Sequence, residues 1–292
     1  MTDLFVEDFG EKSAPPLLYL HGGPGTGSYD FVLYQQDYLI ENVRLITFDQ
    51  RGVLRSPAIT DADSFGINRL IEDIEQIRKS LSISKWTVLG HSFGGYLGVL
   101  YANAYPSSVD KLIFENGTFD LASSARSLLQ GAATEYAILG NLDMSLACMN
   151  LIFATSKRSI SELWSEFTDL TNGLGDHRNR LYVHSIKANF FEDIVKRSSL
   201  SDEDWGKAGM HQKRLFEEGA IFQSLLTHIP NHPTLLLKGK FDYVMSLDQI
   251  HAYLHKNSHT ELIIFENSGH FPHAEEAEKF STEIYRFIGV GK

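Results

Sequence analysis

The stretch of sequence that decides the fold is Trp86-Thr87-Val88-Leu89-Gly90-His91-Ser92-Phe93-Gly94-Gly95-Tyr96. Its first three residues favour a β-strand, and an amphipathic helical pattern begins directly after it. The expected buried face of that helix carries Leu97, Leu100, Tyr101 and Ala104. A Gly-x-Ser-x-Gly turn between a strand and a helix is typical of a nucleophile elbow, which projects the serine hydroxyl clear of the backbone. Ser92 is therefore a candidate nucleophile, at a helix N-terminus that favours developing negative charge.

The glycines of this stretch have a steric purpose. The turn of an elbow is sharp and strained, so small residues are needed two positions before and two positions after the serine. Gly90 and Gly94 stand at those positions, and Gly95 would let the helix approach the sheet closely. The pattern around Ser92 is thus consistent with an elbow in every position that sterics constrain.

The composition sets limits on the class of protein. The chain has 292 residues, of which 43% are hydrophobic and 22% charged, and this suits one globular domain or one domain with an inserted lobe. A net charge of −11 argues against a nucleic-acid partner and against anionic membrane surfaces. Cys148 is the single cysteine, so no intrachain disulfide can form, and its apolar neighbours predict burial.

Targeting and membrane signals are not evident in the sequence. No basic segment followed by an apolar run opens the chain, and no apolar run approaches the roughly 20 residues that span a bilayer. We therefore expect a soluble, cytoplasmic protein without a membrane partner. The sequence does not indicate an oligomeric state.

Short apolar runs and amphipathic segments alternate along both ends of the chain. Strands are expected at residues 4–9, 17–20, 44–48, 86–88, 111–115, 234–237 and 261–265. Continuous apolar runs of this length are typical of strands that are buried on both faces. Helices are expected between them, at residues 35–40, at 70–81 with Asn68 as N-cap, near 247–255 and at 274–288. The alternation predicts an α/β fold, with a mostly parallel, doubly wound sheet covered by helices on both faces.

One long segment interrupts this alternation. From about Gly117 to Ile229 the strand pattern disappears, and the residues are mainly helix formers grouped in apolar clusters. We therefore predict two parts: a core formed by residues 1–117 and 230–292, and a helical cap formed by residues 118–229.

A catalytic serine needs a base within hydrogen-bond reach and an acid that orients the base. In parallel sheets such groups follow the carboxyl ends of the strands. Asp242 follows the strand at 234–237, and His270 follows the strand at 261–265 on a loop that contains glycine. The chain order Ser92, Asp242, His270 is the order expected for a hydrolase of this topology. The rivals are His273 for the base, and Asp120 and Asp248 for the acid.

Acyl transfer also needs two donors for the tetrahedral oxyanion. The backbone N–H of Phe93 follows the nucleophile, and the loop after the first buried strand, His21-Gly22-Gly23-Pro24-Gly25, would supply the second donor. Within this loop we predict that the backbone N–H of Gly23 is the second donor. A phosphate-binding loop is excluded because Gly27 is not followed by Lys, and the glycine spacing does not fit a dinucleotide site.

Three motifs in this order resemble the proline iminopeptidase family of α/β-hydrolases. They are residues 21–25 (His-Gly-Gly-Pro-Gly), residues 49–52 (Asp-Gln-Arg-Gly) and the elbow at Ser92. The resemblance covers residues 17–117 and 233–288. It implies a serine aminopeptidase that removes N-terminal residues, often proline, from short peptides under a helical cap. It implies no metal and no cofactor.

The sequence also departs from this family. The elbow usually reads Gly-Gly-Ser-Trp-Gly in the family, and Val53-Leu54 replace the usual Cys-Gly. The family holds the substrate's α-ammonium with cap glutamates. Glu162 or Glu166 would match one of them, whereas Lys187 stands at the place of the other and would repel an amine.

Three functions are therefore compatible with the sequence. The first is a serine aminopeptidase of the proline iminopeptidase type that acts through an acyl-enzyme. The second keeps the Ser-Asp-His triad but hydrolyses an ester, amide or lactone. The third is a binding protein without catalysis, which the intact set of candidate catalytic residues disfavours.

Overall fold

The chain folds around one seven-stranded sheet. The computed structural model describes residues 3–153, 160–186 and 189–291. The strands are β1 (Val6–Phe9), β2 (Pro16–Leu20), β3 (Arg44–Phe48), β4 (Trp86–His91), β5 (Val109–Glu115), β6 (Thr234–Gly239) and β7 (Thr260–Phe265). They lie in the order β1-β3-β2-β4-β5-β6-β7. Only β1 among them runs antiparallel to its neighbour, so the mostly parallel sheet predicted from the sequence is confirmed.

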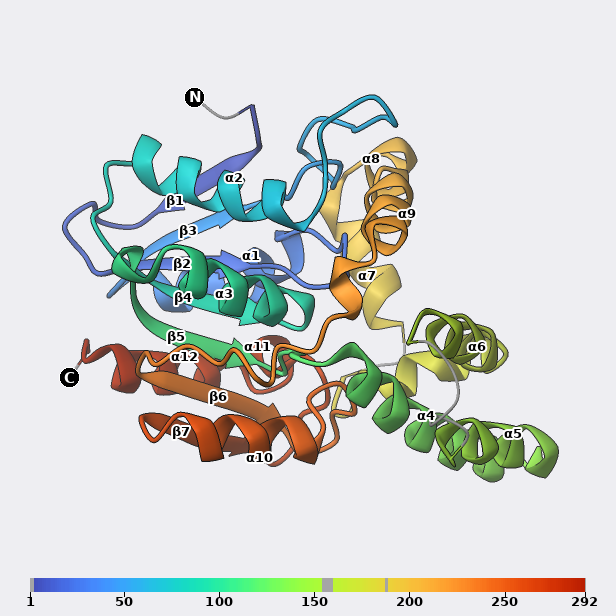
Figure 1. Cartoon of the computed structure of the whole chain (residues 1–292). Coiled ribbons are helices and arrows are strands. Elements are labelled where there is room, and N and C mark those ends of the chain that lie inside the picture. The colour runs from blue at the N-terminus through green and yellow to red at the C-terminus, as the bar shows by residue number, and fades with distance from the viewer. Residues whose placement is uncertain (1–2, 154–159, 187–188, 292) are drawn as a thin grey trace.

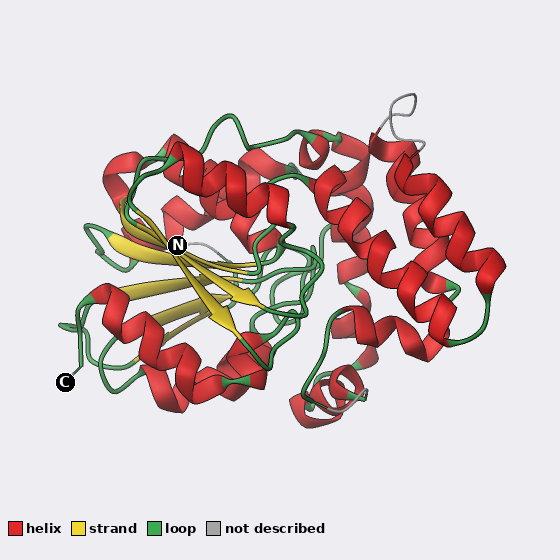
Figure 2. Cartoon of the chain, turned by 90° about the horizontal axis from the view of Figure 1, so that it is seen from below, coloured by secondary structure: helices red, strands yellow, loops and turns green. Residues whose placement is uncertain are grey.

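Helices cover both faces of this sheet (Figure 2). On one face α2 (Ile67–Ser80), α3 (Phe93–Ala104) and α10 (Leu247–Lys256) share an apolar core with one set of strand side chains. On the other face α1 (Tyr29–Leu39) and α12 (Ala277–Ile288) pack against the alternate set, and α11 (Pro272–Glu275) also contacts α1. Leu17 and Leu18 of β2 illustrate the alternation, because they belong to opposite cores.

The segment between β5 and β6 is helical wherever it has regular structure in its described part. It contains α4 (Leu121–Ile138), α5 (Leu142–Phe153), α6 (Ile160–Asn172), η3 (Gly175–Leu181), α7 (Phe190–Ser198), α8 (Asp202–Gly206), α9 (Ala208–Glu218) and η4 (Ala220–Phe222). We call it the helical insertion. Figures 1 and 2 show most of its helices beyond one end of the sheet. Helices α4, α5 and α6 bury an apolar cluster of their own, which includes Cys148.

Helix α9 anchors the insertion to the sheet domain. His211 donates from Nδ1 to the carbonyl of Arg51 at 2.6 Å, and Gln212 donates to the carbonyl of Pro24 at 2.7 Å. Just before α9, the Lys207 ammonium donates to the carbonyl of Leu54 at 2.8 Å. These contacts place α9 over the two loops that follow β2 and β3.

Two helix boundaries differ from the sequence-based expectation. Helix α2 begins at Ile67 rather than after Asn68, because the Glu218 carboxylate of α9 accepts the Ile67 N–H at 2.9 Å. The helix expected at residues 274–288 is two helices, because Glu276 leaves the helical conformation (φ −134°, ψ 54°). The Glu276 carboxylate instead accepts from the Asn267 N–H and the Ser268 hydroxyl, which precede α11.

Within the described part of the chain, every helix is too short or too polar to cross a membrane.

Candidate active site

Ser92 occupies the strained turn between β4 and α3. Its backbone angles are φ 54° and ψ −121°, a region that residues with a side chain rarely adopt. The neighbouring glycines make the turn possible. A Cβ on Gly94 would lie 2.0 Å from the carbonyl oxygen of Leu20, and a Cβ on Gly90 would lie 2.4 Å from the carbonyl oxygen of Gly94. Strain stored at this position is typical of a functional site.

The backbone around Ser92 is fixed to the neighbouring strand. The Ser92 N–H donates to the carbonyl of Glu115 at the end of β5, at 3.1 Å, and the Thr118 N–H donates to the carbonyl of Ser92 at 3.0 Å. The side chain is largely covered, with 9% of the residue exposed. The hydroxyl is therefore presented from a rigid support, as a nucleophile requires.

The structure brings Asp242 and His270 together from the loops after β6 and β7. His270 Nδ1 donates to Asp242 Oδ1 at 2.8 Å, and both residues are buried. Since a carboxylate oxygen accepts, Nδ1 carries the proton in this bond, and Nε2 is the ring nitrogen that can act as acceptor. Asn116, at the end of β5, joins the two loops by accepting the Gly239 N–H and donating to the carbonyl of Gly269, both at 3.0 Å.

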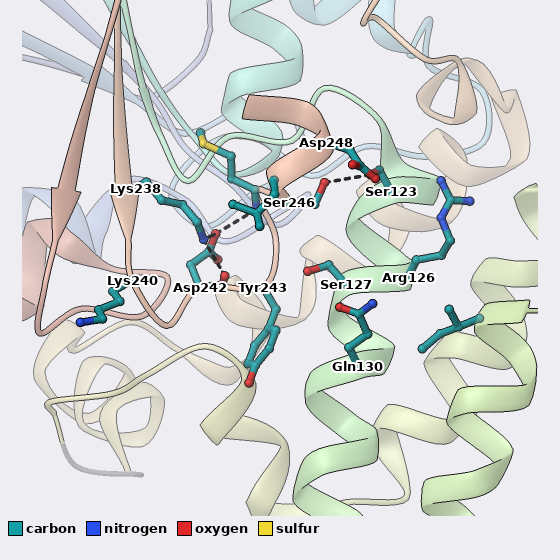
Figure 3. Close-up of a pocket in the computed structure, with 13 residues that line it drawn as sticks. Ser123, Arg126, Ser127, Gln130, Lys238, Lys240, Asp242, Tyr243, Ser246 and Asp248 are labelled. Atoms are coloured by element: carbon teal, nitrogen blue, oxygen red, sulfur yellow. Dashed lines mark hydrogen bonds and ion pairs between the residues drawn. The ribbon is translucent and has the colours of Figure 1, made fainter. Parts of the chain in front are cut away.

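Asp242 is surrounded by donors (Figure 3). Its Oδ2 accepts from the Lys238 ammonium at 2.8 Å and from the Met245 N–H at 2.9 Å, while Oδ1 also accepts from the Val244 N–H at 3.0 Å. Burial alone would raise the pKa of Asp242, but Lys238 and His270 outweigh it, and the pKa lies well below its usual range. The carboxylate is therefore ionised and can orient the imidazole and stabilise its protonated form.

The rival acids and the rival base have other partners or other positions. Asp120 caps α4 by accepting the Ser123 N–H at 2.7 Å, and Asp248 is exposed in the first turn of α10. His273 donates from Nδ1 to the Glu115 carboxylate at 2.9 Å and is fully buried. The geometry therefore favours Asp242 and His270 as the pair next to the elbow.

The loop after β2 comes very close to the elbow. A Cβ on Gly22 would lie 2.8 Å from the Cβ of Ser92, so only glycine fits there. The next residue, Gly23, has φ 111°, which also requires glycine. No described acceptor takes the backbone N–H of Gly23 or of Phe93. Both N–H groups are thus available as donors, and the sequence alone did not single out the close contact at Gly22.

The loop after β3 holds the loop of residues 21–25 in place. His21 Nε2 accepts the Gln50 N–H at 3.0 Å, and the Gln50 side chain donates to the carbonyl of His21 at 3.2 Å. Asp49 accepts from the Ser28 N–H at 2.9 Å and from Arg55 Nε at 2.7 Å. The two motifs at residues 21–25 and 49–52 therefore form one interlocked support.

The helical insertion also contacts the loop that carries His270. The carbonyl of Tyr182 accepts the His270 N–H at 2.6 Å, and the two rings lie 5.7 Å apart. Glu275 bridges the two parts: one carboxylate oxygen accepts the Gly269 N–H, and the other accepts the N–H groups of His184 and Ser185, all at 2.8 Å. Sequence analysis missed these contacts because they join residues that are far apart in the chain.

The carboxylates predicted for substrate binding lie on α6. Glu162 and Glu166 are both exposed, while Leu163 and Phe167 form the buried face of the helix. Trp164 packs against Phe216 of α9, with ring centroids 5.6 Å apart. Lys187 lies outside the described residues.

A cavity of about 520 Å³ adjoins Asp242 on the side of α4 (Figure 3). It lies between α4 and the start of α10, and its polar lining includes Arg126, Lys238 and Asp242. Neither Ser92 nor His270 lines it. Among the described residues, no group of three or more His, Cys, Asp or Glu side chains is arranged to hold a metal ion.

Comparison with known proteins finds proline iminopeptidases among the similar sequences. A relative from Saccharolobus solfataricus, a proline iminopeptidase, is 24% identical over 291 residues, which cover 93% of this chain and 84% of that protein. A proline iminopeptidase from Xylella fastidiosa is 34% identical, but over 110 residues that cover only 34% of its length. The higher identity is thus confined to about a third of that relative.

Solved structures share the fold over nearly the whole chain. A proline iminopeptidase-related protein from Thermus thermophilus has a TM-score of 0.70 at 21% identity, covering 98% of this chain and 93% of its own. An esterase from Exiguobacterium antarcticum has a TM-score of 0.63 at 19% identity, covering 98% and 95%. A family model described as alpha/beta hydrolase fold matches residues 15–277. The chain therefore belongs to the alpha/beta hydrolase family and resembles its proline iminopeptidases.

Proposed function

We propose that this protein is a serine hydrolase of the proline iminopeptidase type, which removes the N-terminal residue of short peptides through an acyl-enzyme. The observation that carries the proposal is the 2.8 Å bond between Asp242 and His270 at the sheet edge where Ser92 stands in a strained elbow. The similarity to proline iminopeptidases supports the substrate class.

The proposed reaction has two halves. His270 Nε2 takes the hydroxyl proton of Ser92 while Oγ forms a bond to the scissile carbonyl carbon. The carbonyl oxygen becomes an oxyanion that accepts hydrogen bonds from the N–H groups of Phe93 and Gly23. The C–N bond then breaks, and His270 returns the proton to the leaving amine. In the second half, water attacks the acyl-enzyme ester by the same steps, the acid product leaves, and Ser92 is free again.

Asp242 supports both halves without accepting the proton. Its negative charge stabilises the His270 imidazolium that forms in each transition state. Lys238 and the N–H groups of Val244 and Met245 keep the carboxylate fixed and ionised. The proposed base therefore keeps its proton on Nδ1 throughout the cycle, and only Nε2 gains and loses a proton.

Substrate selection is proposed for the helical insertion. In this proposal residues 118–229 form a cap, and residues 1–117 and 230–292 form the catalytic core. The core acts only on the scissile bond, so discrimination must come from groups that meet the rest of the substrate. For an aminopeptidase the cap must present carboxylate to the substrate's α-ammonium, and Glu162 and Glu166 are the groups proposed for this contact.

The test compares kcat/KM for three substrates: a free prolyl anilide, its N-acetyl form and a short-chain ester. The aminopeptidase assignment predicts that acetylation lowers kcat/KM by 10-fold or more, since the bound substrate would then cover the carboxylate without pairing it, at a cost of roughly 1–3 kcal/mol. Glu162→Gln and Glu166→Gln should reduce this discrimination. An exposed carboxylate outside the insertion, in Asp37→Asn, serves as control and should leave it unchanged.

Equal or faster turnover of the blocked anilide and the ester would contradict the aminopeptidase assignment. It would instead favour an esterase, amidase or lactonase that uses the same three residues.

A further inference from the structure

Three ionisable side chains form a buried cluster behind the elbow. Glu115 and His273 are fully buried, and Asp30 of α1 is nearly so. His273 Nδ1 donates to the Glu115 carboxylate at 2.9 Å, and its Nε2 lies 3.6 Å from Asp30 Oδ2. The His273 backbone N–H donates to the same Glu115 carboxylate at 2.8 Å. We call Glu115, His273 and Asp30 the buried ion cluster; the proposed reaction uses none of them.

Glu115 connects the cluster to the elbow and to the loop of the base. Its carbonyl accepts the Ser92 N–H at 3.1 Å, while its carboxylate holds His273, three residues after His270. His91 completes the connection, because its ring lies 4.6 Å from that of His270 and 5.5 Å from that of His273. His91 Nε2 also donates to the carbonyl of His270 at 3.0 Å.

The charges of the cluster follow from its surroundings. Burial alone would lower the pKa of His273, but Glu115 and Asp30 outweigh it and raise the pKa to about 10. His273 is therefore an imidazolium between two carboxylates at neutral pH. Burial lowers the pKa of His91 to about 3, so His91 is neutral and adds no charge between the cluster and His270.

The tyrosines around the cluster are also neutral. Tyr19 of β2 and Tyr34 of α1 face it, and burial raises the pKa of both phenols. His270 itself faces Asp242 with its partner Lys238, and the ring of Tyr182, whose pKa burial also raises. Apart from His270 itself, the charges that act on His91 therefore belong to the buried ion cluster.

We propose that Glu115 and His273 are positioning residues for the base: they join the loop of His270 to the elbow, and their opposite charges set the pH at which His270 accepts the proton of Ser92. This inference rests on the proposed function, since it assigns His270 as the base. The two charges act in opposite directions. The His273 imidazolium opposes protonation of His270, whereas the Glu115 carboxylate favours it.

The test measures the second-order rate of Ser92 modification by a fluorophosphonate as a function of pH, a readout that needs no knowledge of the substrate. His273→Gln leaves two carboxylates and should move the midpoint of the acidic limb to higher pH by roughly 0.5–1 unit. Glu115→Gln should move it to lower pH by a smaller amount, because the loss of Glu115 also weakens the positive charge on His273. The double variant removes one charge of each sign and should lie near the wild type.

Asp30→Asn provides a second test, because Asp30 lies at the rim of the cluster and its loss leaves the bonds of Glu115 intact. It should shift the midpoint to lower pH. Asp37→Asn removes an exposed charge from the same helix and is the matched control, with no expected shift. These two variants keep the proposal testable if the Glu115 or His273 variants do not fold.

The proposal would be overturned if the pH midpoint moved in the same direction in all the cluster variants. It would also be overturned if modification became slower with no change of the midpoint, since the cluster would then have a packing role only. A wild-type protein that is not modified at Ser92 at any pH would instead overturn the proposed function. The two failures are therefore distinguishable within one set of measurements.

Discussion

Asp242 is a buried carboxylate that stays ionised because four donors converge on it: Lys238, His270 and two backbone N–H groups. This environment explains why the residue can orient an imidazole without taking its proton. An exposed acid such as Asp248 lacks this set of donors and could not take the same role.

Asp242→Asn tests this assignment at the scale of one residue. The amide would favour the wrong tautomer of His270, so we expect kcat to fall about 10⁴-fold. Asp248→Asn is the control, since Asp248 is exposed on α10 and was the rival acid in the sequence. Its turnover should stay within about twofold of the wild type. A strong loss in Asp248→Asn with little effect in Asp242→Asn would show that the acid is assigned wrongly.

Single residues were predictable from the sequence where a strand end marks them. Asp242 and His270 were predicted as a pair because each lies in the loop after a strand, and the sheet then brings the strand ends together. Glu115 also ends a strand, but no pattern indicated its partners, and Asp30 lies within a helix. Their meeting with His273 depends on three elements that are distant in the chain, and local pattern contains no information about it.

The elbow is an element whose geometry depends on close backbone contacts. A Cβ on Gly94 would lie 2.0 Å from the carbonyl oxygen of Leu20, which is main chain and cannot rotate away. Helix α3 would have to shift relative to β2 to admit any side chain. The position of the Ser92 hydroxyl therefore depends on this glycine.

Gly94→Ala should lower the free energy of unfolding by roughly 1–3 kcal/mol and reduce turnover, because overpacking displaces the elbow. Gly209→Ala is the matched control: a Cβ at Gly209 in α9 would meet no atom within 4 Å. That variant should be as stable as the wild type or more stable, by up to about 1 kcal/mol. Urea unfolding measures both. Wild-type stability and turnover in Gly94→Ala would contradict the proposed packing.

Elements with long apolar runs were predictable, and their boundaries were less so. The strands β2 to β6 lie where the sequence placed them, since their pattern reports burial on both faces, whereas the edge strands β1 and β7 are only partly buried. The predicted start of α2 was wrong because the N–H of Ile67, its first residue, is capped by Glu218 from the helical insertion. This contact joins residues 151 positions apart. The break at Glu276 has a local cause, because its carboxylate accepts from Asn267 and Ser268 in the loop before α11.

The whole molecule consists of a sheet domain and an insertion fixed to it at several places, two of which adjoin the candidate site. Helix α9 lies over the loops after β2 and β3, and residues 182–185 contact the loop of His270 through Glu275. The insertion was predictable as a helical interruption between two strands. Which of its side chains face the sheet domain could not be predicted, because that depends on how the helices dock.

One of these contacts makes stability depend on pH. Burial lowers the pKa of His211 in α9 from 6.5 to about 4. Above pH 6.5 this residue is neutral in both folded and unfolded chains and contributes no pH dependence. Between pH 6.5 and 4 only the unfolded chain binds the proton, so the free energy of unfolding falls as the pH falls, by up to about 1.4 kcal/mol per unit.

His211→Gln should remove this component and give a shallower dependence of unfolding free energy on pH between 6.5 and 4. His255→Gln, a change at an exposed histidine of α10, is the control and should keep the wild-type slope. Chemical denaturation at a series of pH values provides the measurement. An equal slope in His211→Gln and the wild type would show that His211 is not held neutral by its burial against the sheet domain.

The central claim, that Ser92 forms a covalent acyl-enzyme, is tested most directly by mass spectrometry after reaction with a fluorophosphonate. The account predicts one adduct per chain, located by fragmentation on Ser92. It predicts no adduct in Ser92→Ala, whose turnover should fall on the order of 10⁶-fold. An unmodified wild type, an adduct on another residue, or near-normal turnover in Ser92→Ala would contradict it.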